Sequence, residues 1–309
     1  MFRQLIFSVT FILFLSFQQI LSRVERKYEP VAPLDVSPPL SVPEHIPRPE
    51  YVYTGKDEKV PRKILIKNAT EIAAIAESCI IARDVLKMLG YAVRVGTTTD
   101  ELDARAHQLI KLRGAYPSPL NYSGFPKSIC ASVNNIFIHG IPDSRPLRNG
   151  DIVTLDISVY YKGYHGDCAE TFLVGKVDEA GRKLVLATRN ILQTGIDCCG
   201  PGVPFYTIGH RIAQAAAEKG YVVMPQVLGH GIGRYFHEKP DIVHDESASL
   251  NAVMKPGMIF TIEPAIGEGT RNAMLFPDKW SITTEDYSRA AHAEHTILIT
   301  EKGHKILTK

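Results

Sequence analysis

The amino-acid sequence predicts a mixed α+β domain, and three observations support this fold class. The chain has 309 residues, of which 45% are hydrophobic and 22% are charged, a composition typical of a folded globular protein. Segments with helical spacing of apolar residues and β-rich runs follow one another without the regular βαβ period of a parallel sheet. No sequence repeat is present, so a fibrous or repetitive architecture is excluded.

Four helices are expected, each from apolar residues at helical spacing together with a local start or stop signal. The first two begin with possible capping boxes, in which a polar side chain and a glutamate three residues later satisfy free amide groups. The expected helices are residues 69–89 after the box Asn68 and Glu71, a second after the box Thr98 and Glu101, a third from Asp178 towards Gln193, and a fourth over about 204–219 that ends at Gly220.

Strands are expected between and after these helices, where β-branched and aromatic residues gather. The β-rich runs are 130–139, 152–161, 165–174, 221–223, 258–264 and 292–300.

Two segments of different composition precede this domain, which we expect over residues 64–309. Residues 1–26 are a candidate targeting segment, because an apolar run from Leu5 to Phe17 follows Arg3 and is shorter than the roughly 20 residues that a transmembrane helix needs. The run fits a secretory signal that lacks an A-x-A-like cleavage site, or an organelle presequence. Residues 27–63 hold eight of the 20 prolines, so we expect an extended surface linker or strap rather than a domain.

Charge and cysteine content exclude two further classes. Lys and Arg number 35 against 33 Asp and Glu, a net charge of +2, and no dense basic tract occurs, so nucleic acid is not an expected partner. Five cysteines in a chain of this length do not suggest a disulfide framework, and we expect reduced thiols.

Two aspartates lie on the β-hairpin expected over residues 151–172. If Lys162 and Gly163 form the turn, the period of two places Asp156 and Asp167 on the same face, as diagonal neighbours roughly 7 to 8 Å apart. Two carboxylates in a partly buried position are unfavourable unless a cation joins them, so a metal ion is one interpretation. Two solvated aspartates on an exposed face are the other.

Further donors occur in similar settings and favour the metal interpretation. His230 lies in GHGIGRYFHE, Glu263 ends the apolar run MIFTIEP, and Glu294 begins EHTILIT. Four carboxylates and one imidazole suit a pair of Mn, Fe, Co or Zn ions, whereas no Cys or His pair has the spacing of a structural zinc site.

Together these motifs resemble the methionine aminopeptidases of the pita-bread fold. The order Asp, Asp, His, Glu, Glu occurs within HGD at 165–167, GHGIG at 229–233, TIEP at 261–264 and EHT at 294–296, with steps of 11, 63, 33 and 31 residues that match the bacterial-type, or type 1, enzymes. NYSGFPKSICASVNN at 121–135 and VYYKGYHGD are most similar to the mitochondrial type 1 enzymes. The resemblance extends from about residue 64 to the end of the chain.

The resemblance implies a curved antiparallel sheet covered by helices on its outer face, and two divalent metal ions per chain, either Co, Mn, Fe or Zn. The implied metal ligands are Asp156, Asp167, His230, Glu263 and Glu294. A hydroxide held by the metals would attack the first peptide bond, and Glu263 would accept and relay its proton. His139 would contact the nitrogen of that bond, and His237 would stabilise the carbonyl oxygen.

The resemblance also implies a pocket for a methionine side chain. Its implied substrate-binding residues are Tyr122, Phe125, Cys130, His139, Phe236, His237 and Trp280. Ser123 and Phe125 stand where His and Tyr are common in the bacterial enzymes. The expected activity is removal of the initiator methionine from nascent polypeptides with a small second residue. Hydrolysis of X-Pro bonds, or a metal-free pita-bread module that binds proteins, are the alternatives.

The resemblance to organellar enzymes also bears on localisation. A glycan on the formal sequon at Asn121 would lie beside the implied pocket and tend to block it, so secretion conflicts with the expected activity. We therefore expect a mitochondrial protein, with the secretory pathway as the alternative. A monomer without stable membrane insertion is expected.

Overall fold

The computed structural model describes residues 28–55 and 59–309. The targeting segment expected over residues 1–26 lies outside this part of the chain. The described helices are α2 (Glu50–Thr54), α3 (Ala69–Gly90), α4 (Thr99–Leu112), α5 (Glu179–Asp197) and α6 (Tyr206–Ala217), with a 3-10 turn η1 (Tyr122–Gly124). None of them is both long enough and apolar enough to cross a membrane.

The four expected helices are confirmed, and the first two begin with the expected capping boxes. In α3 the side chain of Asn68 accepts from the amide of Glu71 while the Glu71 carboxylate accepts from the amide of Asn68, and Thr98 and Glu101 do the same for α4. The side chain of Asp178 caps α5. The short helix α2, which the sequence did not predict, lies within the proline-rich segment.

The strands form one large antiparallel sheet and two small ones. The large sheet has the order β1-β4-β5-β14-β9-β7-β8, with β2 paired to β4 and β15 paired to β14. The small sheets have the orders β13-β10-β6 and β11-β12-β3. The strands of the large sheet are β1 (Tyr116–Pro117), β2 (Cys130–Val133), β4 (Ile152–Tyr161), β5 (Tyr164–Leu173), β7 (Leu228–Gly231), β8 (Glu238–Val243), β9 (Ile259–Ile262), β14 (Glu294–Thr300) and β15 (Gly303–Ile306). Those of the small sheets are β3 (Ile136–Ile138), β6 (Val222–Val223), β10 (Ala265–Gly267), β11 (Ala273–Leu275), β12 (Ile282–Thr284) and β13 (Ala290–His292).

Two of the expected β-rich runs are divided in the structure. The run 130–139 becomes β2 and β3, because Asn134 adopts a left-handed conformation with a φ of 52° and turns the chain. Its side chain satisfies the turn by accepting from the amide of Ile152 and donating to Asp151. The run 292–300 is interrupted at Ala293, between β13 and β14.

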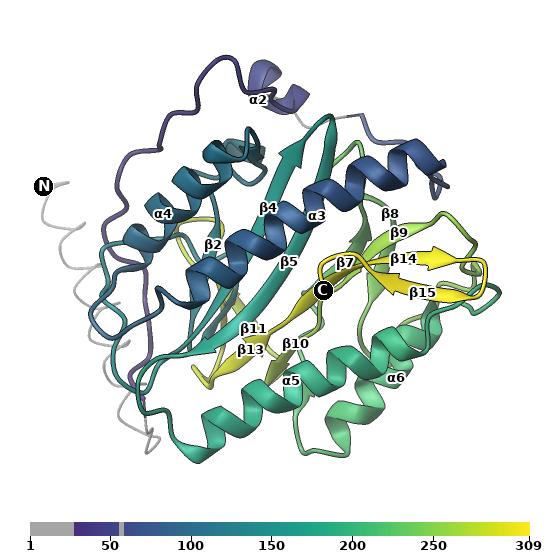
Figure 1. Ribbon diagram of the computed structural model, residues 1–309. Helices are drawn as coiled ribbons and strands as arrows, with labels where there is room; N and C mark the ends of the chain where they lie inside the picture. The colour runs from purple at the N-terminus through teal and green to yellow at the C-terminus, as the bar shows by residue number, and fades with distance from the viewer. Residues whose placement is uncertain (1–27, 56–58) are drawn as a thin grey trace, which may run out of the picture.

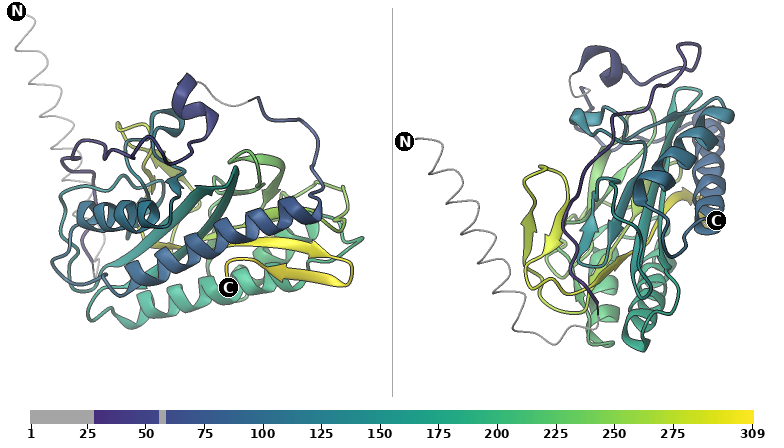
Figure 2. Two further views of the ribbon diagram at one scale, coloured as in Figure 1. Left: turned by 45° about the horizontal axis from the view of Figure 1, so that its top comes forward. Right: turned by 90° about the vertical axis from the view of Figure 1, so that its left-hand side faces the viewer.

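The four longer helices cover one side of the large sheet, as Figures 1 and 2 show. One apolar cluster joins α5 and α6 to β9 and β14, and includes Ile191, Ile212, Phe260 and Ile297. A second joins α3 and α4 to β4. The core therefore lies between helices and sheet, and the opposite side of the sheet is available for a site.

The position of Gly166 establishes which side of β5 faces the helices. A Cβ atom at Gly166 would lie 2.4 Å from the amide nitrogen of Cys79 on α3, so only glycine permits this approach. Because side chains alternate along a strand, the next residue, Asp167, projects to the side away from α3.

Candidate active site

A cavity of about 270 Å³ lies on this second side of the sheet. All twelve side chains that the sequence singled out contribute to its lining, although they come from segments spread over more than 170 residues of chain. The lining consists of Pro119, Tyr122, Phe125, Cys130, Ile138, His139, Asp156, Ser158, Asp167, Gln226, Leu228, His230, Phe236, His237, Glu263, Trp280 and Glu294.

The hairpin of β4 and β5 positions the two aspartates. Tyr161 pairs with Tyr164 across the turn, as expected, which places Asp156 opposite Ala169 and Asp167 opposite Ser158. The two carboxylates are therefore diagonal neighbours on one face. The hydroxyl of Ser158 donates to Oδ1 of Asp167 at 2.7 Å and fixes that side chain.

Two neighbouring strands bring His230 and Glu263 to the same place. Thr261 on β9 connects them, because its hydroxyl donates to Oε1 of Glu263 at 2.6 Å and accepts from the amide of His230 at 2.9 Å. Nδ1 of His230 lies 3.0 Å from the carbonyl oxygen of Gly231. A carbonyl can only accept, so Nδ1 carries the proton and Nε2 keeps a lone pair.

The flanking glycines permit this arrangement. A Cβ atom at Gly229 would lie 2.4 Å from the carbonyl oxygen of Thr261, and one at Gly231 would lie 2.3 Å from that of Lys239. The strand that carries His230 therefore approaches its neighbours more closely than any residue with a side chain would allow.

Burial makes the carboxylate cluster unfavourable without a cation. Burial raises the pKa of Asp167 to about 7. It also raises the pKa values of Asp156, Glu263 and Glu294 well above their ordinary range, and the neighbouring carboxylates raise them further. Two buried oxygens of the cluster, Oδ1 of Asp156 and Oε1 of Glu294, have no hydrogen-bond partner.

A divalent metal ion fits these groups. Ligand atoms of Asp167, His230 and Glu294 lie within 4.8 Å of one another. Nε2 of His230 lies 3.9 Å from Oδ2 of Asp167 and 3.5 Å from Oε1 of Glu263, so the imidazole lone pair and the carboxylates face a common centre. A cation there would engage the two oxygens that lack partners and offset the repulsion between the carboxylates.

Two more imidazoles, His139 and His237, line the cavity beside the carboxylates. Burial lowers the pKa of His139 to about 4 and that of His237 well below its ordinary value, so both rings are neutral at pH 7. Nδ1 of His237 lies 2.9 Å from the hydroxyl of Tyr122. Each neutral ring offers one N–H donor.

Apart from Gln226, the remaining wall of the cavity is aromatic and apolar. The ring of Phe125 meets that of Trp280 edge to face with centroids 5.1 Å apart, and the rings of Tyr122 and Phe236 are also 5.1 Å apart. Burial raises the pKa of the Cys130 thiol well above its ordinary value, so the thiol is neutral. This side of the cavity suits an unbranched, polarizable side chain.

Three buried histidines near the site were not predicted as site residues from the sequence. The hydroxyl of Ser118 lies 2.8 Å from Nδ1 of His165, whose ring stacks on Phe236. Nε2 of His244 accepts from the amide of Glu263 at 3.2 Å, and Nε2 of His292 lies 4.0 Å from Oε2 of Glu263. Only His165 had a signal, since it lies two residues before Asp167 and therefore shares its face of β5.

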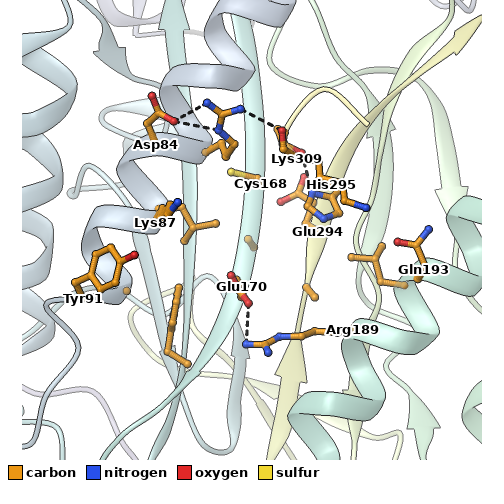
Figure 3. Close-up of a pocket in the computed structure, with 18 residues that line it drawn as sticks. Asp84, Lys87, Tyr91, Cys168, Glu170, Arg189, Gln193, Glu294, His295 and Lys309 are labelled. Atoms are coloured by element: carbon orange, nitrogen blue, oxygen red, sulfur yellow. Dashed lines mark hydrogen bonds and ion pairs between the residues drawn. The ribbon is translucent and has the colours of Figure 1, made fainter. Parts of the chain in front are cut away.

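A larger cavity of about 820 Å³ lies on the helix-covered side, between α3 and α5 (Figure 3). Two ion pairs at 2.7 Å lie in its lining, Arg83 with Asp84 and Arg189 with Glu170, and of the five implied metal ligands only Glu294 also lines it. The cavity therefore has the larger volume but lacks the cluster of four carboxylates and His230 that converges in the first site.

Known proteins resemble the chain in both sequence and fold. Residues 73–301 match the profile of metallopeptidase family M24. The chain is 48% identical over 279 residues to the mitochondrial methionine aminopeptidase 1D of Homo sapiens, a match that covers 90% of this chain and 83% of the relative. The crystal structure of the methionine aminopeptidase from Rickettsia prowazekii has a TM-score of 0.78 and 37% identity, covering 80% of this chain and 100% of that chain.

A prolidase from Pyrococcus furiosus is more distant, with a TM-score of 0.64 and 25% identity, and the match covers 79% of this chain and 65% of the prolidase. These likenesses confirm the expected pita-bread fold, a curved antiparallel sheet with helices on its outer side. The chain belongs to metallopeptidase family M24.

Proposed function

We infer that the protein removes the N-terminal methionine from polypeptides whose second residue is small. One observation supports this function above all others. A cluster of buried carboxylates and one imidazole shares a single cavity with an aromatic wall suited to a thioether, in a chain that is 48% identical to a methionine aminopeptidase.

Asp156, Asp167, His230, Glu263 and Glu294 would hold two divalent ions, either Co, Mn, Fe or Zn. Such ions lower the pKa of a coordinated water towards about 7 and polarise a substrate carbonyl. This assignment is supported by the oxygens of Asp156 and Glu294 that have no hydrogen-bond partner, and by the raised pKa values of the buried carboxylates.

Glu263 is the residue proposed to accept and relay a proton. Its carboxylate is held by the hydroxyl of Thr261, and its backbone amide donates to His244. His244 has a fixed tautomer, because its Nδ1 faces the carbonyl oxygen of Val227 and must carry the proton while Nε2 accepts. The carboxylate that receives the proton is thus oriented through both its side chain and its backbone.

His139 and His237 would orient the first peptide bond. We propose that His139 contacts the peptide nitrogen and that His237 donates to the carbonyl oxygen. If the Tyr122 hydroxyl donates to Nδ1 of His237, Nε2 carries the proton and becomes the donor that the oxygen needs as it gains negative charge.

Tyr122, Phe125, Cys130, Phe236 and Trp280 would enclose the methionine side chain. The cavity has a volume of about 270 Å³, which accommodates one methionine side chain and little more than the first peptide bond of the substrate. This size supports a steric preference for a small second residue.

The proposed partners are the N-termini of newly made polypeptides, and the proposed state is a monomer. The mitochondrial name of the human relative supports a mitochondrial location. We keep the proposed division into a targeting segment (1–26), a proline-rich extension (27–63) and a catalytic domain (64–309). A fluorescent fusion of the first sixty residues tests the location, and its appearance in the secretory pathway would overturn it.

Peptide assays test the function and separate it from X-Pro hydrolysis and from a metal-free binding role. We expect the purified protein to release methionine from Met-Ala-Ser, to leave Ala-Pro peptides intact, to lose activity with a chelator and to regain it with Mn or Co. Preferential cleavage of Ala-Pro peptides, activity that resists the chelator, or equal rates with Gly and Lys at the second position would each contradict the proposal.

A further inference from the structure

The proline-rich segment is bound along its length to the domain that carries the site. The amide of Val31 donates to the side chain of Asn135 at 2.6 Å, and that side chain donates back to the Val31 carbonyl at 3.0 Å. The amide of Leu34 donates to the Asp143 carboxylate at 2.8 Å. Figure 1 shows the first part of the segment in purple, passing outside α4 and leading into α2. Its buried apolar side chains are Val31, Val42, Ile46 and Tyr51.

At α2 the segment inserts one tyrosine beside the candidate active site. Helix α2 follows Pro49 and closes at Gly55, which adopts a left-handed conformation with a φ of 62°. Tyr51 is its one buried residue, with 2% of its surface exposed, and its hydroxyl donates to the carbonyl of Ser118 at 2.5 Å. Tyr53, two residues later, is 69% exposed.

The ring of Tyr51 supports two side chains of the cavity wall. It meets the ring of Tyr122 edge to face, with centroids 5.1 Å apart and an interplanar angle of 82°. It also stacks against His165 at 6.4 Å, and His165 in turn stacks on Phe236 at 5.1 Å. Tyr51 therefore contacts Tyr122 directly, and it contacts Phe236 indirectly, with the ring of His165 between them.

The backbone of Tyr122 donates to Pro119 at 3.0 Å and accepts from Phe125 at 2.9 Å, but its turn contains two residues in left-handed conformations. Tyr122 lies in the turn η1 between Asn121, with a φ of 65° that asparagine tolerates, and Ser123, with a φ of 46° that is unfavourable for serine. Such a turn persists only when surrounding contacts hold it. The contact with Tyr51 comes from a segment more than 60 residues away in the chain.

We propose that Tyr51 is a positioning residue for the substrate side of the active site. It holds Tyr122, and through the 2.9 Å contact between the Tyr122 hydroxyl and Nδ1 of His237 it orients the imidazole that would face the substrate. The proline-rich segment is then part of the working enzyme, because it supplies this tyrosine. The contacts of Tyr51 do not depend on the proposed function, and the inference rests on that function only because the assay measures it.

Steady-state kinetics of the full-length protein with Met-Ala-Ser test the proposal. Tyr51→Ala is expected to raise KM and to lower kcat/KM at least about tenfold, because misplacement of binding groups by about 1 Å can cost about 100-fold and a smaller shift costs proportionately less. Tyr51→Phe keeps the ring contact and is expected to restore most of the activity. Tyr53→Ala, on the same helix but exposed, is the matched control and should behave as wild type.

The KM value distinguishes positioning from a loss of folded protein. Unfolding of a fraction of the molecules lowers the apparent kcat but leaves KM unchanged, so an unchanged KM in Tyr51→Ala overturns the proposal. If Tyr51→Ala does not fold, Tyr51→Leu keeps apolar volume without the aromatic contact, and the same rise in KM is expected of it.

A double variant tests whether the effect passes through Tyr122. Removal of the Tyr122 hydroxyl in Tyr122→Phe should make the added effect of Tyr51→Ala smaller than in the wild-type background, and independent, additive effects would contradict the proposed path. If the wild-type protein does not cleave Met-Ala-Ser, the proposed function fails. If it does and Tyr51→Ala is equally active, only the inference about Tyr51 fails.

Discussion

Gly229→Ala is predicted to displace His230 and so to reduce activity sharply. The added Cβ would lie 2.4 Å from the carbonyl oxygen of Thr261, which is backbone and cannot move aside alone. Ordinary contact begins at 3.4 Å, so the two chain segments have to separate by about 1 Å. The same Thr261 holds both the amide of His230 and the carboxylate of Glu263, so the shift reaches two of the proposed metal ligands.

Displacements of about 1 Å can lower rates about 100-fold, and we expect a loss of this order in kcat/KM for Met-Ala-Ser together with weaker binding of added Mn. Gly303→Ala is the matched control, because a Cβ there meets nothing within 4 Å and its φ is not in the left-handed region. Kinetics and Mn titration by calorimetry measure both effects. A Gly229→Ala enzyme within twofold of wild type in activity and in Mn affinity would refute the reasoning.

Three further predictions follow from buried groups. Lys67→Met leaves the carboxylate of Glu238 buried without its ion-pair partner, so urea denaturation should show a loss of about 3–5 kcal/mol, and a loss below about 1 kcal/mol would count against a buried pair. Burial raises the pKa of Asp167 from 3.8 to about 7, so its carboxyl binds protons more tightly in the folded state. The contribution of this group to the stability of chelator-treated protein should therefore be fully present below pH 3.8 and be lost as the pH rises towards 7. Because the buried histidines with lowered pKa values act in the opposite sense, the measurement compares wild type with Asp167→Asn: the free energy of unfolding of wild type relative to the variant should fall from pH 5 to pH 7, and a rise in this difference would contradict the prediction. Thr261→Val removes the donor to Glu263 and should lower kcat at least about tenfold, whereas unchanged kcat would show that this hydrogen bond does not orient the carboxylate.

The hairpin that carries the aspartates was predictable in detail. Its turn residues are local, and strand alternation has a fixed period of two, so the register of Tyr161 against Tyr164 followed from sequence alone. The capping boxes of α3 and α4 were equally local. The ligands and pocket residues were named through a family resemblance, because no rule of periodicity connects positions as far apart as Tyr122 and Trp280.

Other features had no local signal. The run 130–139 divides because Asn134 turns the chain and is satisfied by Asp151 and the amide of Ile152, a contact that depends on how the strands meet. The roles of His244 and His292 depend on their distances to Glu263, and a lone histidine in a sequence does not indicate them. The proline content of the N-terminal segment predicted an extended strap, but not the burial of Tyr51.

By itself, the sequence determined the four longer helices, the hairpin, the shared face of Asp156 and Asp167, and the donor set that suits divalent metals, since these depend on neighbours a few residues apart or on residue chemistry. The tertiary structure alone decided that four carboxylates and an imidazole share one cavity, that two of their oxygens lack partners, and that an N-terminal tyrosine packs against Tyr122 in the cavity wall. The physical reason is that these features arise from burial and from contacts between distant segments, and both exist only after the sheet has curved and the strap has bound to it.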